Sequence, residues 1–216
     1  MKTKRNVLGI CLLGIVLLPV VVQAQFKFTT NNGSITITGY NTAAGLNAII
    51  PAATNGYPVT SIGQYAFEAS TVTNVVIPNS VTNIGSYAFY DCSSLTSVYF
   101  QGNAPVNGSD TSVFLNDTNT IYYLPGKTGW HSPFDGRPAV LWNPQSQSSG
   151  AMFGVQTNQF GFNLTGSSGM VIVVEGSTDL VNWMPVATNT LTTGSSYFSD
   201  PQWTNYPGRF YRLRSP

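Results

Sequence analysis

The chain has 216 residues, of which 42% are hydrophobic and only 8% charged, and its formal net charge is +1. Ordinary soluble domains carry about 25% charged residues, whereas this surface is rich in Ser, Thr, Asn and Gly. No basic stripe is present to neutralise phosphates, so we expect no nucleic-acid partner. The single His and two Cys argue against a zinc-type metal site, and no cofactor is expected.

Residues 1–24 have the pattern of a secretory signal peptide. Three basic residues precede an apolar run over residues 7–22. The segment Val22-Gln23-Ala24 at the end of this run is suited to cleavage by a signal peptidase. A transmembrane helix needs about 20 apolar residues, and this run is shorter and contains Pro19. We therefore expect a secreted or cell-surface protein that meets the membrane only before cleavage. Cys92 is then the only remaining cysteine, so stability must come from core burial and not from a disulfide.

A nine-residue segment occurs twice in the chain in similar form. "VTSIGQYAF" at residues 59–67 returns as "VTNIGSYAF" at residues 81–89, a spacing of 22. Past one inserted residue the spacing becomes 23, which aligns Val75 with Val98 and Ile77 with Phe100. Periods of about 20 to 29 residues predict a solenoid of stacked coils.

Each coil is expected to contain a short strand and a compact turn. Val75 and Val98 are predicted to point inward, and Phe67 and Phe89 to fill the space behind the strand. Gly63 and Gly85 are expected to let the chain turn. The repetition is thereby explained as a packing requirement, because a single coil cannot bury its own apolar face.

The segment "VTNIGSYAFYDCSSLTSVYF" resembles the BspA-like leucine-rich repeat of bacterial surface and secreted proteins, and the resemblance is specific over residues 58–103. Ile50-Pro51 and Leu124-Pro125 echo Ile77-Pro78, so we expect imperfect coils on both sides. The resemblance implies a solenoid with a parallel sheet over residues 25–142. "ITITGY" is expected to cap its start, and "TIYYLPGKTGW" to close its end.

Two segments contain residue types that could support catalysis or metal binding. His131, Ser132 and Asp135 share one loop, and adjacent residues cannot easily place an imidazole between two oxygens, so no catalytic residue is expected there. That loop is instead expected to cover the last coil with Trp130, Phe134 and Trp142. The simplest interpretation of Asp110 and Asp117 is that they form turns. A calcium site made of these two side chains and backbone carbonyls stays open as an alternative.

The C-terminal third is expected to form a second unit. "NPQSQSSGAM" at residues 143–152 has the composition of a linker. Five alternating runs follow in residues 153–216 and predict a small antiparallel β-sandwich. "VVEGSTDLVNWMPVATNTL" with "FSDPQWTNYPGRFYRLRSP" resembles a C-terminal module of secreted bacterial proteins related to fibronectin type III. Its position implies a sorting, anchoring or spacer role. The whole chain is thus predicted to be mainly β, a leucine-rich-repeat solenoid followed by a β-sandwich.

The function predicted from these features is binding, with no enzyme activity. If Val75 and Val98 point inward, alternate residues point outward, and the repeat register places Ile49, Val76, Tyr99 and Tyr123 in one exposed row. The candidate ligand-binding residues are Asn74, Val76, Ser97, Tyr99, Gln101 and Tyr123, and the expected partner is an extracellular protein or glycan. A passive surface or matrix protein stays open as an alternative, and a polysaccharide-active enzyme lacks a credible acid pair.

Overall fold

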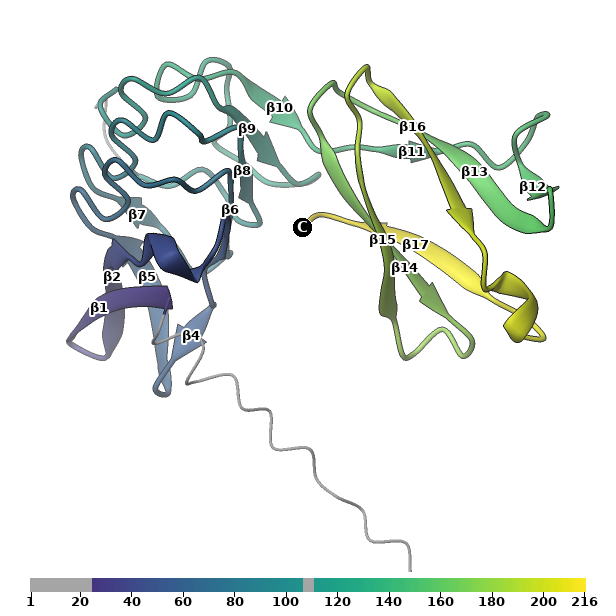
Figure 1. Ribbon diagram of the computed structural model, residues 1–216. Helices are drawn as coiled ribbons and strands as arrows, with labels where there is room; N and C mark the ends of the chain where they lie inside the picture. Colours follow the sequence, from purple (N-terminus) through teal and green to yellow (C-terminus); the bar gives the residue numbers. More distant parts are fainter. Residues whose placement is uncertain (1–24, 107–110) are drawn as a thin grey trace, which may run out of the picture.

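The computed structural model describes residues 25–106 and 111–216, so the expected signal peptide of residues 1–24 lies outside the described residues. The described residues are mainly strands, with two short 3-10 helices, η1 at Thr42–Ala44 and η2 at Trp203–Asn205 (Figure 1). Neither helix in this part of the chain has the length and apolar character that crossing a bilayer requires.

A parallel sheet runs along one side of the repeat region. Its strands, in spatial order β10-β9-β8-β6-β3, are β3 (Asn47–Ile49), β6 (Asn74–Ile77), β8 (Ser97–Phe100), β9 (Thr120–Tyr123) and β10 (Ala139–Leu141). Val75 pairs with Val98, which pairs in turn with Ile121. Parallel neighbours need a crossover between them, and here each crossover is one coil of the solenoid. The predicted parallel sheet is confirmed.

A second sheet covers the start of the solenoid. It contains β1 (Phe26–Asn31), β2 (Ser34–Tyr40), β4 (Ala53–Thr54), β5 (Tyr57–Ile62) and β7 (Asn83–Ile84). β1 and β2 form an antiparallel hairpin, and β2 pairs with β5 in parallel, so "ITITGY" lies between the edge strand β1 and β5. The expected closing strand is corrected: β9 lies inside the parallel sheet, because β10 pairs with it and takes the outermost place.

Stacked aromatic rings fill the interior of the coils. Phe67 and Phe89 lie with their ring centroids 4.7 Å apart, and Phe114 continues the stack at 5.2 Å from Phe89. All three side chains are buried, as are the inward residues Val75 and Val98. The predictions for Phe67, Phe89, Val75 and Val98 are therefore confirmed, and Phe114 supplies the same ring in the next coil.

The repeated glycines are needed for a reason that differs from the expected one. A Cβ on Gly85 would lie 2.6 Å from the backbone nitrogen of Gln64 in the preceding coil. The left-handed conformation of this turn belongs to Tyr65 and Tyr87, at φ 57 and 59 degrees. Gly85 is thus required by the close approach of neighbouring coils and not by a positive φ.

The C-terminal region consists of two antiparallel sheets. One joins β11 (Gln145–Ser146), β12 (Gly154–Gln156), β13 (Gln159–Thr165) and β16 (Ser195–Asp200), and the other joins β14 (Val171–Ser177), β15 (Met184–Thr190) and β17 (Phe210–Arg214). The five strands expected from the alternating runs are present. Buried side chains from both sheets share one core, as the grouping of Phe162 and Phe198 with Ile172 and Val174 shows.

The expected linker is partly structured. β11 lies within residues 143–152 and pairs with β13, and Gln147 extends the contact by donating its backbone N–H to the Asn163 carbonyl at 2.9 Å. The C-terminal sheet therefore begins before residue 153. The division of the chain into two folding units stays a prediction.

Candidate functional site

The outward row of the parallel sheet differs by one residue from the expected row. Strand pairing aligns Ile49 with Val76, Val76 with Tyr99, and Tyr99 with Tyr122. Tyr123 instead stacks on Trp130, with ring centroids 5.2 Å apart, and packs against the solenoid core. The Leu124-Pro125 echo of Ile77-Pro78 caused the shift, because pairing sets Tyr123, and not Leu124, in register with Phe100 and Ile77.

Most of this row is covered by the C-terminal region, so the expectation of an open docking face is wrong. Val76, Tyr99 and Tyr122 retain only 3%, 2% and 1% of their exposure, and they belong to the same hydrophobic cluster as Phe162 and Ile172. Figure 1 shows the C-terminal strands beside β6, β8 and β9. Val76 and Tyr99 of the predicted binding surface therefore contact another part of the same chain.

Three hydrogen bonds join the two regions. The Tyr99 hydroxyl accepts the Val171 N–H at 2.8 Å, and the Tyr122 hydroxyl donates to the Ser168 carbonyl at 3.1 Å. Trp142 donates from Nε1 to the Val171 carbonyl at 3.3 Å. Trp142 was expected to shield the last coil, but it belongs to this contact. Burial raises the pKa of Tyr99 to about 12, so its hydroxyl stays neutral in this contact.

The remaining predicted residues lie around this contact. Ser97 is buried at the start of β8, whereas Asn74 and Gln101 are half-buried. Asn74 donates from Nδ2 to Oδ1 of Asn47 at 2.8 Å, which links the first residues of β6 and β3. The Gln101 N–H bonds the Ile77 carbonyl just beyond the end of β8.

Where the contact ends, a groove opens between the parallel sheet and the C-terminal region. Its volume is about 320 Å³, which is within the common range for ligand pockets. The sheet contributes Asn47, Ala48, Ile49, Asn74 and Val76, and the C-terminal region contributes Val171, Val173, Thr188, Thr190, Arg214 and Pro216. Two predicted residues, Asn74 and Val76, thus line it. Sequence reasoning missed the opposite wall, since no sequence pattern shows which strands face the solenoid.

The groove combines an aliphatic floor with neutral hydrogen-bonding groups. Ile49 is the most accessible apolar side chain of its row, at 60% exposure. Arg214 is the one charged side chain that lines the groove, and it donates from Nε to Glu175 at 2.8 Å. Burial alone raises the pKa of Glu175, but the hydrogen bonds and charges of Arg214 and Arg212 outweigh it, and its net pKa is lowered. Glu175 is therefore ionised and pairs with both Arg214 and Arg212.

The His131 loop holds its polar groups in backbone contacts. His131 Nδ1 lies 2.7 Å from the Pro133 carbonyl, and the Ser132 hydroxyl oxygen accepts the Ala139 N–H at 3.1 Å. Neither of these two contacts joins the imidazole to the hydroxyl. Trp130 and Phe134 pack against the solenoid core, as expected.

Asp117 is buried at the end of the solenoid, beside Arg137, which donates from Nη1 to the Asp117 carbonyl oxygen. Burial raises the pKa of the Asp117 carboxyl to about 6, against the opposing effects of the nearby Cys92 backbone and the charge of Arg137. Asp110 lies outside the described residues, so the calcium hypothesis is not tested there. Within residues 25–106 and 111–216, no three His, Cys, Asp or Glu residues gather as metal ligands.

Comparison with known proteins identifies the repeat region. The model of the BspA type leucine-rich repeat region matches residues 24–126, in six copies. No curated protein matches the chain.

Solved structures of leucine-rich repeat proteins are similar to about half of the chain. A leucine-rich repeat protein from Bacteroides capillosus ATCC 29799 is 29% identical over 45% of this chain and 93% of that chain, with a TM-score of 0.35. A leucine rich cell surface protein from Faecalibacterium prausnitzii A2-165 is 34% identical over 46% of this chain and 31% of that chain, also with a TM-score of 0.35. The leucine-rich repeat protein of T. pallidum is 18% identical over 46% of this chain and 69% of that chain, with a TM-score of 0.32.

The period of the repeats, the parallel sheet with its stacked phenylalanines, and the family match agree. Residues 24–126 of this chain are therefore similar to the BspA type leucine rich repeat region.

Proposed function

We propose that this protein is an exported binding module that holds an extended segment of an extracellular protein in the groove between its repeat sheet and its C-terminal region. In this proposal residues 1–24 direct export, and the two C-terminal sheets form a sandwich related to fibronectin type III. That sandwich completes the binding site, which is a more specific role than sorting, anchoring or spacing.

The observation that carries the proposal is the composition of the groove. Its floor is aliphatic and contains no aromatic lining residue, so it offers no flat ring for a sugar to stack on. An extended polypeptide suits such a surface, because its side chains alternate in direction. Apolar side chains can contact Ile49 and Val173, while its amide groups bond to Asn47, Asn74 and Thr188.

A substitution at the entrance of the groove tests the proposal. Peptides are selected from a random library against the mature protein, and their affinities are then measured for Ile49→Asp and for the matched control Val181→Asp. Val181 is also accessible, at 78% exposure against 60% for Ile49, but lies outside the groove lining. Loss of an interface anchor typically costs about 2 kcal/mol or more, so Ile49→Asp should weaken binding at least about thirtyfold and Val181→Asp should not.

Selected peptides that bind both variants as well as the original protein would place recognition outside the groove. A selection that yields no specific peptide would favour the alternative of a passive surface or matrix protein.

A further inference from the structure

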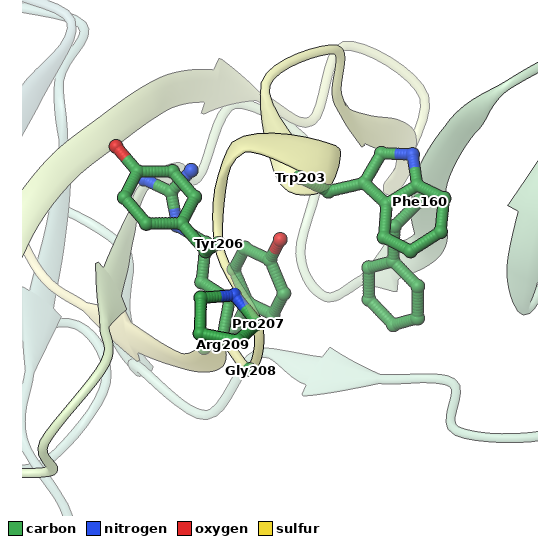
Figure 2. A pocket seen from close by; sticks show the side chains of 7 residues that line it. Phe160, Trp203, Tyr206, Pro207, Gly208 and Arg209 are labelled. Atoms are coloured by element: carbon green, nitrogen blue, oxygen red, sulfur yellow. The ribbon is translucent and has the colours of Figure 1, made fainter.

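The C-terminal region carries a second pocket, which shares no lining residue with the groove. Its volume is about 170 Å³, and it is lined by Phe160, Trp203, Tyr206, Pro207, Gly208, Arg209 and Tyr211. Figure 2 shows Trp203 and Phe160 on one side of it and Tyr206, Pro207 and Arg209 on the other. Four of its seven lining residues are aromatic, in contrast to the aliphatic groove.

The aromatic rings are held in place by contacts behind them. Trp203 donates from Nε1 to the Asn158 carbonyl at 3.1 Å. Phe160 and Tyr211 are stacked, with centroids 5.3 Å apart and an interplanar angle of 8 degrees. The Arg209 guanidinium lies 4.2 Å from the centroid of the Tyr206 ring. A ligand that enters the pocket therefore meets rings whose orientation is already set, which reduces the entropy lost on binding.

The pocket has no free charge, although Arg209 lines it. Arg209 Nη1 lies 2.7 Å from Oδ2 of Asp200, which is 1% exposed. The Tyr211 hydroxyl donates to the same carboxylate oxygen at 2.8 Å. Because the guanidinium is paired with a buried carboxylate, the pocket does not select an anion, and an uncharged ligand suits it better.

A larger hollow continues from this pocket. Its volume is about 270 Å³, and it shares Phe160, Arg209 and Tyr211 with the first pocket. It adds the exposed aromatic rings Phe153 and Phe210 and the neutral polar residues Ser146, Gln147 and Ser148. Hydroxyl and amide groups of this kind bond well to the hydroxyls of an uncharged ligand. The two hollows together are suited to successive rings of one chain molecule.

We propose that the pocket between Trp203 and Tyr206 binds a pyranose ring of a neutral polysaccharide. The face of a pyranose ring carries C–H groups, and these are attracted to the electron-rich face of an aromatic ring. The ring hydroxyls point away from that face toward the rim, where neutral polar side chains can bond them. A phosphate or uronic acid is disfavoured, since Asp200 already neutralises the only cation of the lining. This site goes beyond the groove, because it gives the C-terminal region a ligand of its own.

Affinity electrophoresis of the mature protein in gels that contain a neutral soluble polysaccharide tests the proposal. The probes are a β-1,4-glucan, a β-1,3-glucan, a xylan, a mannan and an α-glucan, each in a separate gel. At least one should retard the protein. Trp203→Ala should weaken that retardation about tenfold, as expected for loss of one aromatic stacking partner, and Trp203→Phe should restore most of it.

Two further variants distinguish a loss of binding from a loss of folding. Tyr206→Ala removes an exposed ring from the opposite wall and should weaken binding to a similar extent. Trp183→Ala is the matched control, because Trp183 belongs to the same region but lies under Arg212, at 4.4 Å from its guanidinium carbon, and outside the pocket lining. It should leave the retardation unchanged, and thermal unfolding of each variant checks the fold.

Three outcomes would overturn the proposal: no probe retards the original protein, Trp203→Ala and Tyr206→Ala keep their affinity, or Trp183→Ala loses as much as they do. Binding to immobilised gelatin that depends on Trp203, without binding to any polysaccharide, would assign the pocket to a polypeptide and overturn it as well.

Discussion

The hydroxyl of Tyr99 provides a direct test of the contact between the repeat sheet and the C-terminal region. Tyr99→Phe keeps the ring but removes the acceptor of the Val171 N–H, which lies 2.8 Å away in a buried contact. A buried donor left without its partner costs about 1 to 3 kcal/mol. Tyr99→Ala also removes a ring that is 2% exposed and stacked 5.0 Å from Tyr122, so its cost should reach about 3 to 5 kcal/mol.

The assay combines urea unfolding with hydrogen exchange at the Val171 amide. Tyr99→Phe should lower the free energy of unfolding by about 1 to 3 kcal/mol and speed exchange at Val171. The control Tyr65→Phe alters a tyrosine that is 43% exposed, and it should change stability by less than about 0.5 kcal/mol. If Tyr99→Phe costs no more than this control, and Val171 exchange is unchanged, the two regions do not pack through Tyr99 in solution.

Three other predictions concern the solenoid. Phe89→Ala removes the middle ring of the aromatic stack and should cost about 3 to 5 kcal/mol in urea unfolding; a loss below about 1 kcal/mol would contradict the stacked coils. Gly85→Ala places a methyl group 2.6 Å from the Gln64 nitrogen and should lower the melting temperature, although φ at this position is ordinary; an unchanged melting temperature would show that the coils can separate without cost. Asp117 binds its proton more tightly in the folded state, where its pKa is about 6 instead of 3.8. Its contribution therefore favours folding at low pH and declines as pH rises from about 4 to 6, by on the order of 1 to 3 kcal/mol. Asp117→Asn should remove this decline and raise stability above pH 6, and an identical pH profile in the variant would refute the raised pKa.

Local sequence pattern was sufficient for the repeat coils and for the strands of the C-terminal region. The repeat marks Phe67 and Phe89 as equivalents because each coil presents the same space to its neighbour, and both rings are buried and stacked. The apolar runs at residues 160–166 and 170–177 became β13 and β14, and β14 is buried along most of its length. The repeat spacing and the apolar runs can be read along the chain without knowing which distant strands meet.

The tertiary structure decided which faces are covered and which residues stand side by side. Tyr99 was correctly placed on the outer face of the sheet, but a sequence register does not show that β14 and its neighbours pack over that face. The one-residue error that placed Tyr123 in the row in place of Tyr122 has a related cause. Leu124-Pro125 resembles Ile77-Pro78 in sequence, but backbone pairing between β8 and β9 sets the actual register. The aromatic pocket likewise joins Phe160 to Trp203 and Tyr206, more than 40 residues apart in the sequence. Burial between distant strands depends on complementary surfaces that meet only after both have folded, so it leaves no periodic signal in the sequence.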